Sequence, residues 1–334
     1  MLQIPIQQPV EMVTTRMNPH VHPHLHVWGY EIPTYLFLGG LVGGILILSS
    51  LLGFMAKKKG KQVSPVVAWM PLVSLGLLSV GMLFLFLDLS HKLYVWRFYT
   101  AFEWTSPMSW GAWILLIVYP VGFLLSMNLL DEKGREKVVA FCPMKRLGMK
   151  SPLKALADWA AKRSEGLLTT GMFAGIALAI YTGILLANNG GRVVWSSALM
   201  GPLFLASGLS TGAAFFLLFR SREEEHSSLL RLDIIAIIAE LVLLFLLFLG
   251  YGTSGTGGHS ALSNFLGGPW TAPFFGLVVF LGLLVPLGME LYEKKHHAVA
   301  TRLVPILVLI GGFFLRYVLV ASGQAISIAQ VTVH

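Results

Sequence analysis

Ionisable side chains occur inside segments that are apolar enough to lie in a lipid bilayer. Arg316 follows the run "LVPILVLIGGFF", and Glu240 lies within "IIAELVLLFLLF". A charge within a bilayer is costly unless it is paired or faces a polar cavity, so such residues bind ligands, carry protons or fix helix packing. For Arg316 a functional role and a packing role both stay open, and its candidate partners are Asp88 and Glu240.

The composition is that of a membrane protein. Of 334 residues, 55% are hydrophobic and 12% are charged, against about 25% charged in a typical soluble domain. The net charge of +8 is explained below by topology, so it does not indicate a nucleic-acid partner. The single cysteine, Cys142, excludes an all-cysteine iron–sulfur cluster and an internal disulfide within the chain.

Hydropathy predicts an all-α integral membrane protein, because a spanning helix needs about 20 apolar residues. "TSPMSW" marks the start of the third span, with Ser106 as a cap and Pro107 at the first helical position. "TSGTGG" and "ANNGGR" resemble turns. The eight expected spans cover residues 33–56, 66–90, 108–130, 167–187, 196–219, 231–251, 272–292 and 303–322.

The distribution of basic residues predicts the orientation. Of the 24 Lys and Arg residues, 19 follow spans one, three, five and seven, and four lie on the other side. The positive-inside rule therefore places both termini outside. We expect a multi-pass protein of a prokaryotic cytoplasmic membrane, with an outer arm at 1–32, a spanning domain at 33–322, a cytoplasmic loop at 131–166 and an outer tail at 323–334. The arm lacks a charged start followed by an apolar core, so no cleavable signal peptide is expected.

With this orientation, several polar side chains fall at one depth. Glu31, Tyr35, Asp88, Tyr181 and Arg316 lie in the outer part of their spans, which predicts a shared pocket. Glu240 lies near mid-depth, whereas Asp233 and Glu290 lie near the inner ends. The two halves run in the same direction, which is compatible with two parallel four-helix bundles. The glycines of "GGLVGG" recur at four-residue spacing, which favours close helix packing.

The histidines argue against a haem protein. A membrane b-type haem takes axial ligands, usually histidines, from inside the bundle, and none of the ten histidines falls within an expected span. The run "PHVHPHLH" places His20, His22, His24 and His26 on one side of an extended segment, which could bind Zn²⁺ or Cu²⁺. The alternative is an extended arm that contacts a partner or the membrane surface, since Pro19 and Pro23 alone explain the extension.

Several motifs along the chain together resemble the NrfD/PsrC family, the membrane subunits of polysulfide-reductase-like, quinone-linked complexes. The resemblance covers about residues 28–325. The matching stretches are "YLFLGGLVGG", "LDLSHKLYVWRF", "TSPMSWGAW", "YTGILL", "SGLSTGAA" and "GGFFLRYVLVASGQ".

The resemblance implies a subunit that binds menaquinone or ubiquinone near its outer face and carries no haem or iron–sulfur cluster of its own. It implies a ferredoxin-like iron–sulfur partner on that face, which leads to a catalytic subunit, either a molybdopterin enzyme or a multihaem cytochrome. Tyr181 matches a family position that hydrogen-bonds a quinone carbonyl. Tyr35 stands near a position where some members have a histidine, so Tyr35, Glu31 and His26 are candidates for the second contact.

The resemblance also makes Asp88 and Arg316 pocket or proton-path residues, and Glu240 and Asp233 proton carriers. We therefore expect a quinone-reactive subunit that is not catalytic alone and that exchanges electrons between the quinone pool and the iron–sulfur partner, with proton translocation left open. Two alternatives are a secondary transporter of ions or small solutes and a passive membrane anchor of a peripheral enzyme.

Overall fold

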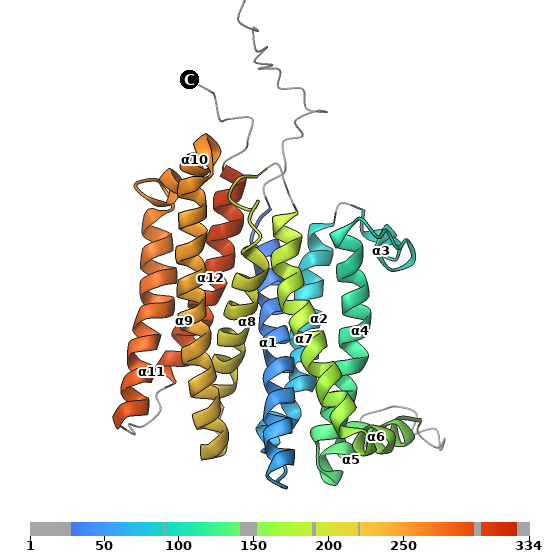
Figure 1. The fold of residues 1–334 in the computed structure, drawn as a ribbon. Coiled ribbons are helices and arrows are strands. Elements are labelled where there is room, and N and C mark those ends of the chain that lie inside the picture. The colour runs from blue at the N-terminus through green and yellow to red at the C-terminus, as the bar shows by residue number, and fades with distance from the viewer. Residues whose placement is uncertain are drawn as a thin grey trace, which may run out of the picture.

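The computed structural model is an all-helical bundle (Figure 1), and it describes residues 28–89, 91–140, 152–188, 192–219, 221–296 and 302–325. Eight helices are long and apolar enough to cross a membrane. They are α1 (Glu31–Lys58), α2 (Pro65–Asp88), α4 (Pro107–Leu129), α7 (Ser164–Ala187), α8 (Met200–Leu217), α9 (Glu223–Thr253), the continuous pair η3 (Pro273–Leu284) and α11 (Val285–His296), and α12 (Leu303–Ala325).

These helices confirm the eight expected spans, with differences at three of them. The sixth begins eight residues early, at Glu223, because three glutamates occupy its first turn and favour the positive end of the helix dipole. The fifth begins four residues late, at Met200. The first half of the seventh, η3, is a π-helix, which hydropathy does not distinguish from an α-helix.

Shorter helices lie between the spans. They are η1 (Lys92–Tyr94), α3 (Arg97–Thr100), α5 (Glu132–Ala140), α6 (Pro152–Lys162) and α10 (Gly255–Phe265). The turn predicted at "TSGTGG" is limited to its centre, where Ser254 lies between α9 and α10 and Gly255 takes a φ of +68°; the rest of the segment is helical. The expected loop at 131–166 contains α6, whose sequence "PLKALADWAAK" alternates apolar and polar residues at helical spacing. This helix is held to α4 by Asn128 Nδ2, which donates to Ala160 O at 2.8 Å.

Helix α1 forms the centre of the bundle. It packs against α2, α4 and α7 on one side and against α8 and α12 on the other (Figure 1). Its glycines divide between the two sides, since Gly39 and Gly43 face α7 whereas Gly40 and Gly44 face α8 and α12. A Cβ on Gly43 would lie 2.7 Å from Gly175 O, and one on Gly44 would lie 1.9 Å from Gly208 O. The four-residue spacing therefore marks two close helix contacts, as expected from small residues in membrane interfaces.

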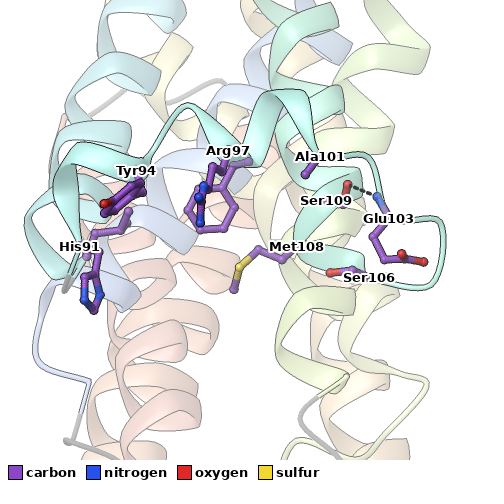
Figure 2. Close-up of a pocket in the computed structure, with 10 residues that line it drawn as sticks. His91, Tyr94, Arg97, Ala101, Glu103, Ser106, Met108 and Ser109 are labelled. Atoms are coloured by element: carbon purple, nitrogen blue, oxygen red, sulfur yellow. Dashed lines mark hydrogen bonds between the residues drawn. The ribbon is translucent and has the colours of Figure 1, made fainter.

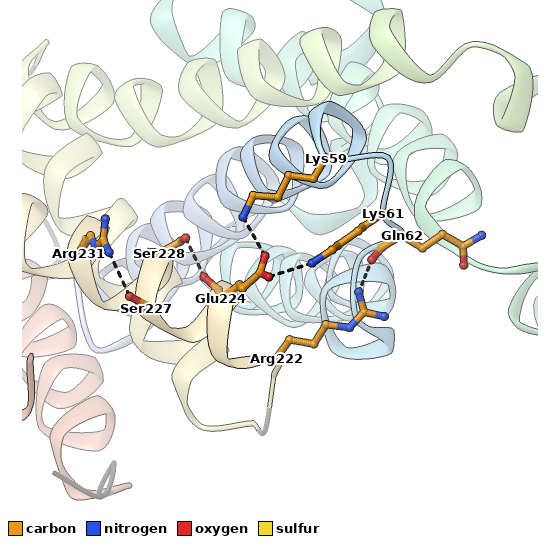
Figure 3. A network of polar contacts seen from close by, with 8 residues as sticks. All are labelled: Lys59, Lys61, Gln62, Arg222, Glu224, Ser227, Ser228 and Arg231. Carbon is orange, nitrogen blue, oxygen red and sulfur yellow. Dashed lines mark hydrogen bonds and ion pairs between the residues drawn. The ribbon is translucent and has the colours of Figure 1, made fainter. Parts of the chain in front are cut away.

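The two ends of the bundle differ in chemistry. At the end that carries Lys57–Lys61, called here the basic end, Glu224 of α9 accepts from Lys59 Nζ at 2.8 Å and from Lys61 Nζ at 2.9 Å (Figure 3). Arg222 also donates to Gln62 O (Figure 3). These contacts join the turn after α1 to the start of α9.

At the opposite end, Trp28 and Gln324 exchange two hydrogen bonds, Trp28 N to Gln324 Oε1 at 2.6 Å and Gln324 Nε2 to Trp28 O at 3.1 Å. The indole of Trp28 stacks on Trp195, with ring centroids 5.3 Å apart. The start of α1 and the end of α12 are thereby tied together. Helix α12 runs through Ala325 and α1 begins at Glu31, so both extend slightly beyond the expected spanning domain.

Replacing Gly44 by alanine tests the α1–α8 contact. We expect Gly44→Ala to lower the melting temperature in detergent, because the new methyl group overlaps the Gly208 carbonyl and overpacking costs about 1–3 kcal/mol. Gly76→Ala is the matched control, since Gly76 lies within α2 and a Cβ there meets no atom within 4 Å. Equal melting temperatures for the two variants would contradict the contact.

Candidate functional site

A cavity of about 520 Å³ lies among the first four spans, at the end of the bundle opposite the basic end, called here the pocket end. Its walls come from α1, α2, α4 and α7 and from the segment 95–99 that joins α2 to α4. Most of its lining is apolar, and polar groups enter at only a few points. The side chains with ionisable or hydroxyl groups on this wall are Tyr35, Asp88, Tyr99, Ser106 and Tyr181.

Tyr181 is held in place by a glycine on the neighbouring helix. Its side chain is 4% exposed, and its phenol end lies against the backbone of Gly111. A Cβ on Gly111 would lie 1.9 Å from Tyr181 Oη, so only glycine leaves room for this approach. Gly111 is a site residue that we did not predict, although it lies within the "SPMSWGAW" motif that drew attention to this region.

Tyr35 comes from α1 and meets Tyr181 inside the cavity. It is 2% exposed, and its phenol group interacts with the Tyr181 hydroxyl. Two phenol groups from helices far apart in the sequence therefore share one apolar cavity, as the common depth of these residues suggested. Each hydroxyl can donate or accept a hydrogen bond, so the pair can bind a ligand oxygen and exchange a proton with it.

The remaining pocket candidates lie at different places. Asp88 is exposed at the cavity rim, where Glu31 is a neighbouring negative charge, and Glu31 itself is not part of the lining. His26, with the other three histidines of the arm, lies outside the described residues. Within the described ranges no group of three or more His, Cys, Asp or Glu side chains is arranged to hold a metal ion.

A second hollow, of about 420 Å³, adjoins the cavity on the outside of the α2–α4 connection. Figure 2 shows His91, Tyr94 and Arg97 on one side of it and Glu103 with Ser109 on the other. The guanidinium of Arg97 lies over the Tyr94 ring, 4.8 Å from its centroid. Hydrogen bonds from the Thr105 hydroxyl and amide lower the pKa of the Glu103 carboxyl.

The two hollows share one wall. Leu89, Phe98, Ser106 and Met108 line both of them. The connection between α2 and α4 therefore contributes to the walls of both hollows.

Arg316 does not line the cavity. It is fully buried between α1, α8 and α12, and its Nη1 donates to Ser207 Oγ at 2.5 Å and to Gly312 O at 2.8 Å. Its guanidinium lies against Gly40, where a Cβ would be 2.8 Å from Nη2. Gly40 of the "GGLVGG" run therefore also leaves room for the Arg316 guanidinium, which the glycine spacing did not indicate.

Of the two candidate partners of Arg316, the structure brings Glu240 close and leaves Asp88 at the cavity rim. Glu240, 2% exposed, interacts electrostatically with Arg316, and Ser207 contacts both side chains. Four ion pairs, with N–O distances of 2.8–2.9 Å, occur among the described residues, and none of them joins Arg316 to Glu240. Ser207 therefore bridges a buried cation and a buried carboxyl group.

Further polar groups continue along the same helices toward the basic end. Asp233 is one of them, two turns before Glu240 on α9 and fully buried, and its Oδ1 accepts from Ser210 Oγ at 2.6 Å. Ser207 and Ser210 are three residues apart on α8, so they present hydroxyls to α9 on one face. The predicted proton carriers thus form a row between α8 and α9, separate from the cavity.

Removing the buried cation tests its coupling to Glu240. We expect Arg316→Met to destabilise the protein by about 3–5 kcal/mol, because it leaves a buried carboxyl group without its counter-charge. The double variant Arg316→Met/Glu240→Gln should lose less than the sum of the two single variants, as measured by melting temperature in detergent. Arg231→Met, which changes an exposed arginine on α9, is the control. Strictly additive losses would show that the two groups are independent.

Comparison with known proteins agrees with this architecture. The family model described as "Polysulphide reductase, NrfD" matches residues 17–329. Protein NrfD of Escherichia coli is 27% identical over 317 residues, covering 91% of this chain and 96% of that protein. A polysulfide reductase chain of Wolinella succinogenes is 28% identical over 318 residues, covering 89% of this chain and 94% of that protein.

A more distant relative is a putative dimethyl sulfoxide reductase membrane subunit of Halobacterium salinarum. It is 27% identical over 192 residues, covering 57% of this chain and 42% of that protein. The family model covers nearly all of the chain, and the eight apolar helices are those of a multi-pass membrane protein. The chain belongs to the NrfD family of polysulphide-reductase-type membrane proteins.

Proposed function

We propose that this chain is the quinone-reactive membrane subunit of an oxidoreductase complex. Its named relatives include one chain of a polysulfide reductase and a putative membrane subunit of a dimethyl sulfoxide reductase, which supports the role of a subunit rather than of a complete enzyme. The observation that carries the quinone assignment is the meeting of Tyr35 and Tyr181 in one mostly apolar cavity of about 520 Å³.

The cavity suits the chemistry of a quinone head group. A quinone presents a flat apolar ring and two carbonyl oxygens, and it is reduced by two electrons and two protons to the quinol. The apolar lining accommodates a ring and an isoprenoid tail, while the phenols of Tyr35 and Tyr181 can donate hydrogen bonds to oxygen. Asp88, at the rim, is placed to exchange protons between the cavity and the pocket end. Menaquinone and ubiquinone both satisfy this description.

Electrons have to enter or leave at the pocket end, because the cavity lies there and the chain's single cysteine cannot hold an iron–sulfur cluster. We assign that face to a ferredoxin-like iron–sulfur subunit, which connects to a molybdopterin or multihaem catalytic subunit. The connection between α2 and α4 lines both the cavity and the hollow beside it, so we assign it to the surface that the partner contacts.

We assign the basic end to the cytoplasm of a prokaryote, following the positive-inside rule. The pocket end and both termini then face outward, with residues 1–32 as an outer arm and 323–334 as an outer tail. The row of polar groups formed by Arg316, Ser207, Glu240, Ser210 and Asp233 leads from the middle of the bundle toward the cytoplasmic side. These residues are our candidates for proton transfer. In this row, Arg316 stabilises the negative charge of Glu240 inside the bundle.

Purification in mild detergent from the native membrane tests the assignment. We expect an iron–sulfur subunit and a catalytic subunit to copurify, as identified by mass spectrometry, and a quinone to be extractable from the complex. A protein that purifies alone without quinone and that supports ion-dependent uptake in vesicles would favour the transporter alternative. A complex that assembles but contains no quinone would favour the passive anchor.

Removing one hydroxyl tests the role of Tyr181. In the purified complex, we expect Tyr181→Phe to raise the Kd of a soluble quinone analogue roughly three- to tenfold, because a lost hydrogen bond costs about 0.5–1.5 kcal/mol. Tyr251→Phe is the matched control. That tyrosine is equally buried, on α9, but its hydroxyl donates to Val194 O and it does not line the cavity. If the two variants change the Kd equally, the hydrogen bond from Tyr181 is not part of the site.

A further inference from the structure

Two buried carboxyl groups face each other in the half of the bundle nearer the basic end. Asp233 of α9 is 0% exposed and Glu290 of α11 is 1% exposed, and the two groups interact directly. Both residues were expected near the inner ends of their spans, but they are 57 positions apart in the sequence, so no local pattern pairs them.

The surroundings of this pair provide very little compensation for negative charge. Ser210 Oγ donates to Asp233 Oδ1 at 2.6 Å. Apart from the contact between the two carboxyl groups themselves, no donor in the described part of the chain reaches Asp233 Oδ2 or either oxygen of Glu290. The ionisable groups that act on the pair are Glu240 and Glu293, and both are acidic. No ion pair among the described residues involves Asp233 or Glu290.

Like charges in one buried site repel each other, and burial removes the water that would solvate them. Two ionised carboxylates are therefore strongly disfavoured here. A single proton resolves the problem, because a protonated Glu290 can donate to Asp233 Oδ2 while Ser210 donates to Oδ1. The pair then carries one negative charge instead of two, and an oxygen on each carboxyl group gains a hydrogen-bond partner.

A polar contact leads from the pair toward the basic end. Glu293 lies one turn beyond Glu290 on α11 and acts on it electrostatically, and its Oε1 lies 2.9 Å from His226 Nε2. The side chains of His226 and Glu293 are 27% and 15% exposed, so they are reachable by water. His226 falls inside α9 because this helix begins earlier than expected, which is why its position in the sequence did not suggest a membrane site.

We propose that the Asp233–Glu290 pair is a proton-binding site that holds one exchangeable proton and exchanges it with the basic end through His226 and Glu293. On loading, a proton moves from water or the His226 imidazolium to a Glu290 oxygen, and no electrons are transferred. Only the role of this site, to supply or remove protons during quinone turnover, rests on the proposed function.

Infrared spectroscopy of the purified complex tests the site directly. We expect the wild type to show a carboxylic acid C=O band that shifts in D₂O, and we expect Glu290→Gln to lose it. Asp233→Asn should lose the same band, since Glu290 can then ionise and accept a hydrogen bond from the new amide. Glu136→Gln, which makes the same chemical change at an exposed position on α5, should keep the band. His226→Phe should keep the band but slow its shift in D₂O.

Several outcomes would overturn the proposal. If the band persists in both Glu290→Gln and Asp233→Asn, the proton resides elsewhere. The wild type could instead lack the band and melt at a higher temperature in NaCl than in choline chloride. If Glu290→Gln shows no such difference between the two salts, the pair binds a metal cation. If His226→Phe leaves the rate of the D₂O shift unchanged, exchange follows another route.

Quinone content of the same samples separates this inference from the proposed function. The pair does not line the cavity, so Glu290→Gln should retain as much extractable quinone as the wild type. A wild-type complex with quinone but without the band would contradict the inference alone. A complex with the band but without quinone would contradict the proposed function alone.

Discussion

The close approach of α1 to its neighbours is the constraint on which the rest of the structure depends. Gly43 meets Gly175 of α7, and Gly44 meets Gly208 of α8, at distances that leave no space for a side chain. Because lipid provides no hydrophobic force between helices, such backbone contacts are a main source of their association. One six-residue run therefore fixes both the helix that carries Tyr181 and the helix that carries Ser207.

This central helix also separates two kinds of polar chemistry. On its α2–α4–α7 side, phenol groups and a rim carboxylate enclose a mostly apolar cavity that suits a neutral ring with two oxygens. On its α8–α12 side, a guanidinium and three buried carboxyl groups form a row with hydroxyl bridges. Gly40 contacts the second region through Arg316, whereas Tyr35, on the same helix, lies in the first.

Arg316 both holds two helices together and provides a positive charge beside a buried carboxyl group. Its hydrogen bonds to Ser207 and Phe204 tie α12 to α8, and its hydrogen bond to Gly312 O stays within α12. The same group is the positive neighbour of Glu240. A buried cation that fixes helix packing and also balances a buried carboxyl group is consistent with the rarity of charges in bilayers, where each charge needs compensation.

The sequence by itself determined the eight spans, the class of protein, the family resemblance and the depth of most polar residues. These properties depend on local hydropathy, on charge counts and on short motifs, which are readable without knowing how the helices rotate. It identified Tyr35, Tyr181 and Asp88 as residues of one pocket because depth alone brings them to one level, and all three line the same cavity.

Only the tertiary structure decided which side chains meet. Helix rotation and crossing place Glu240 rather than Asp88 beside Arg316, and they bring Glu290 to Asp233. Gly111 became a site residue only through its contact with Tyr181, and His226 entered a helix only through the early start of α9. The physical reason is that these contacts join residues of separate helices, so they depend on the packing of whole helix faces rather than on any local pattern.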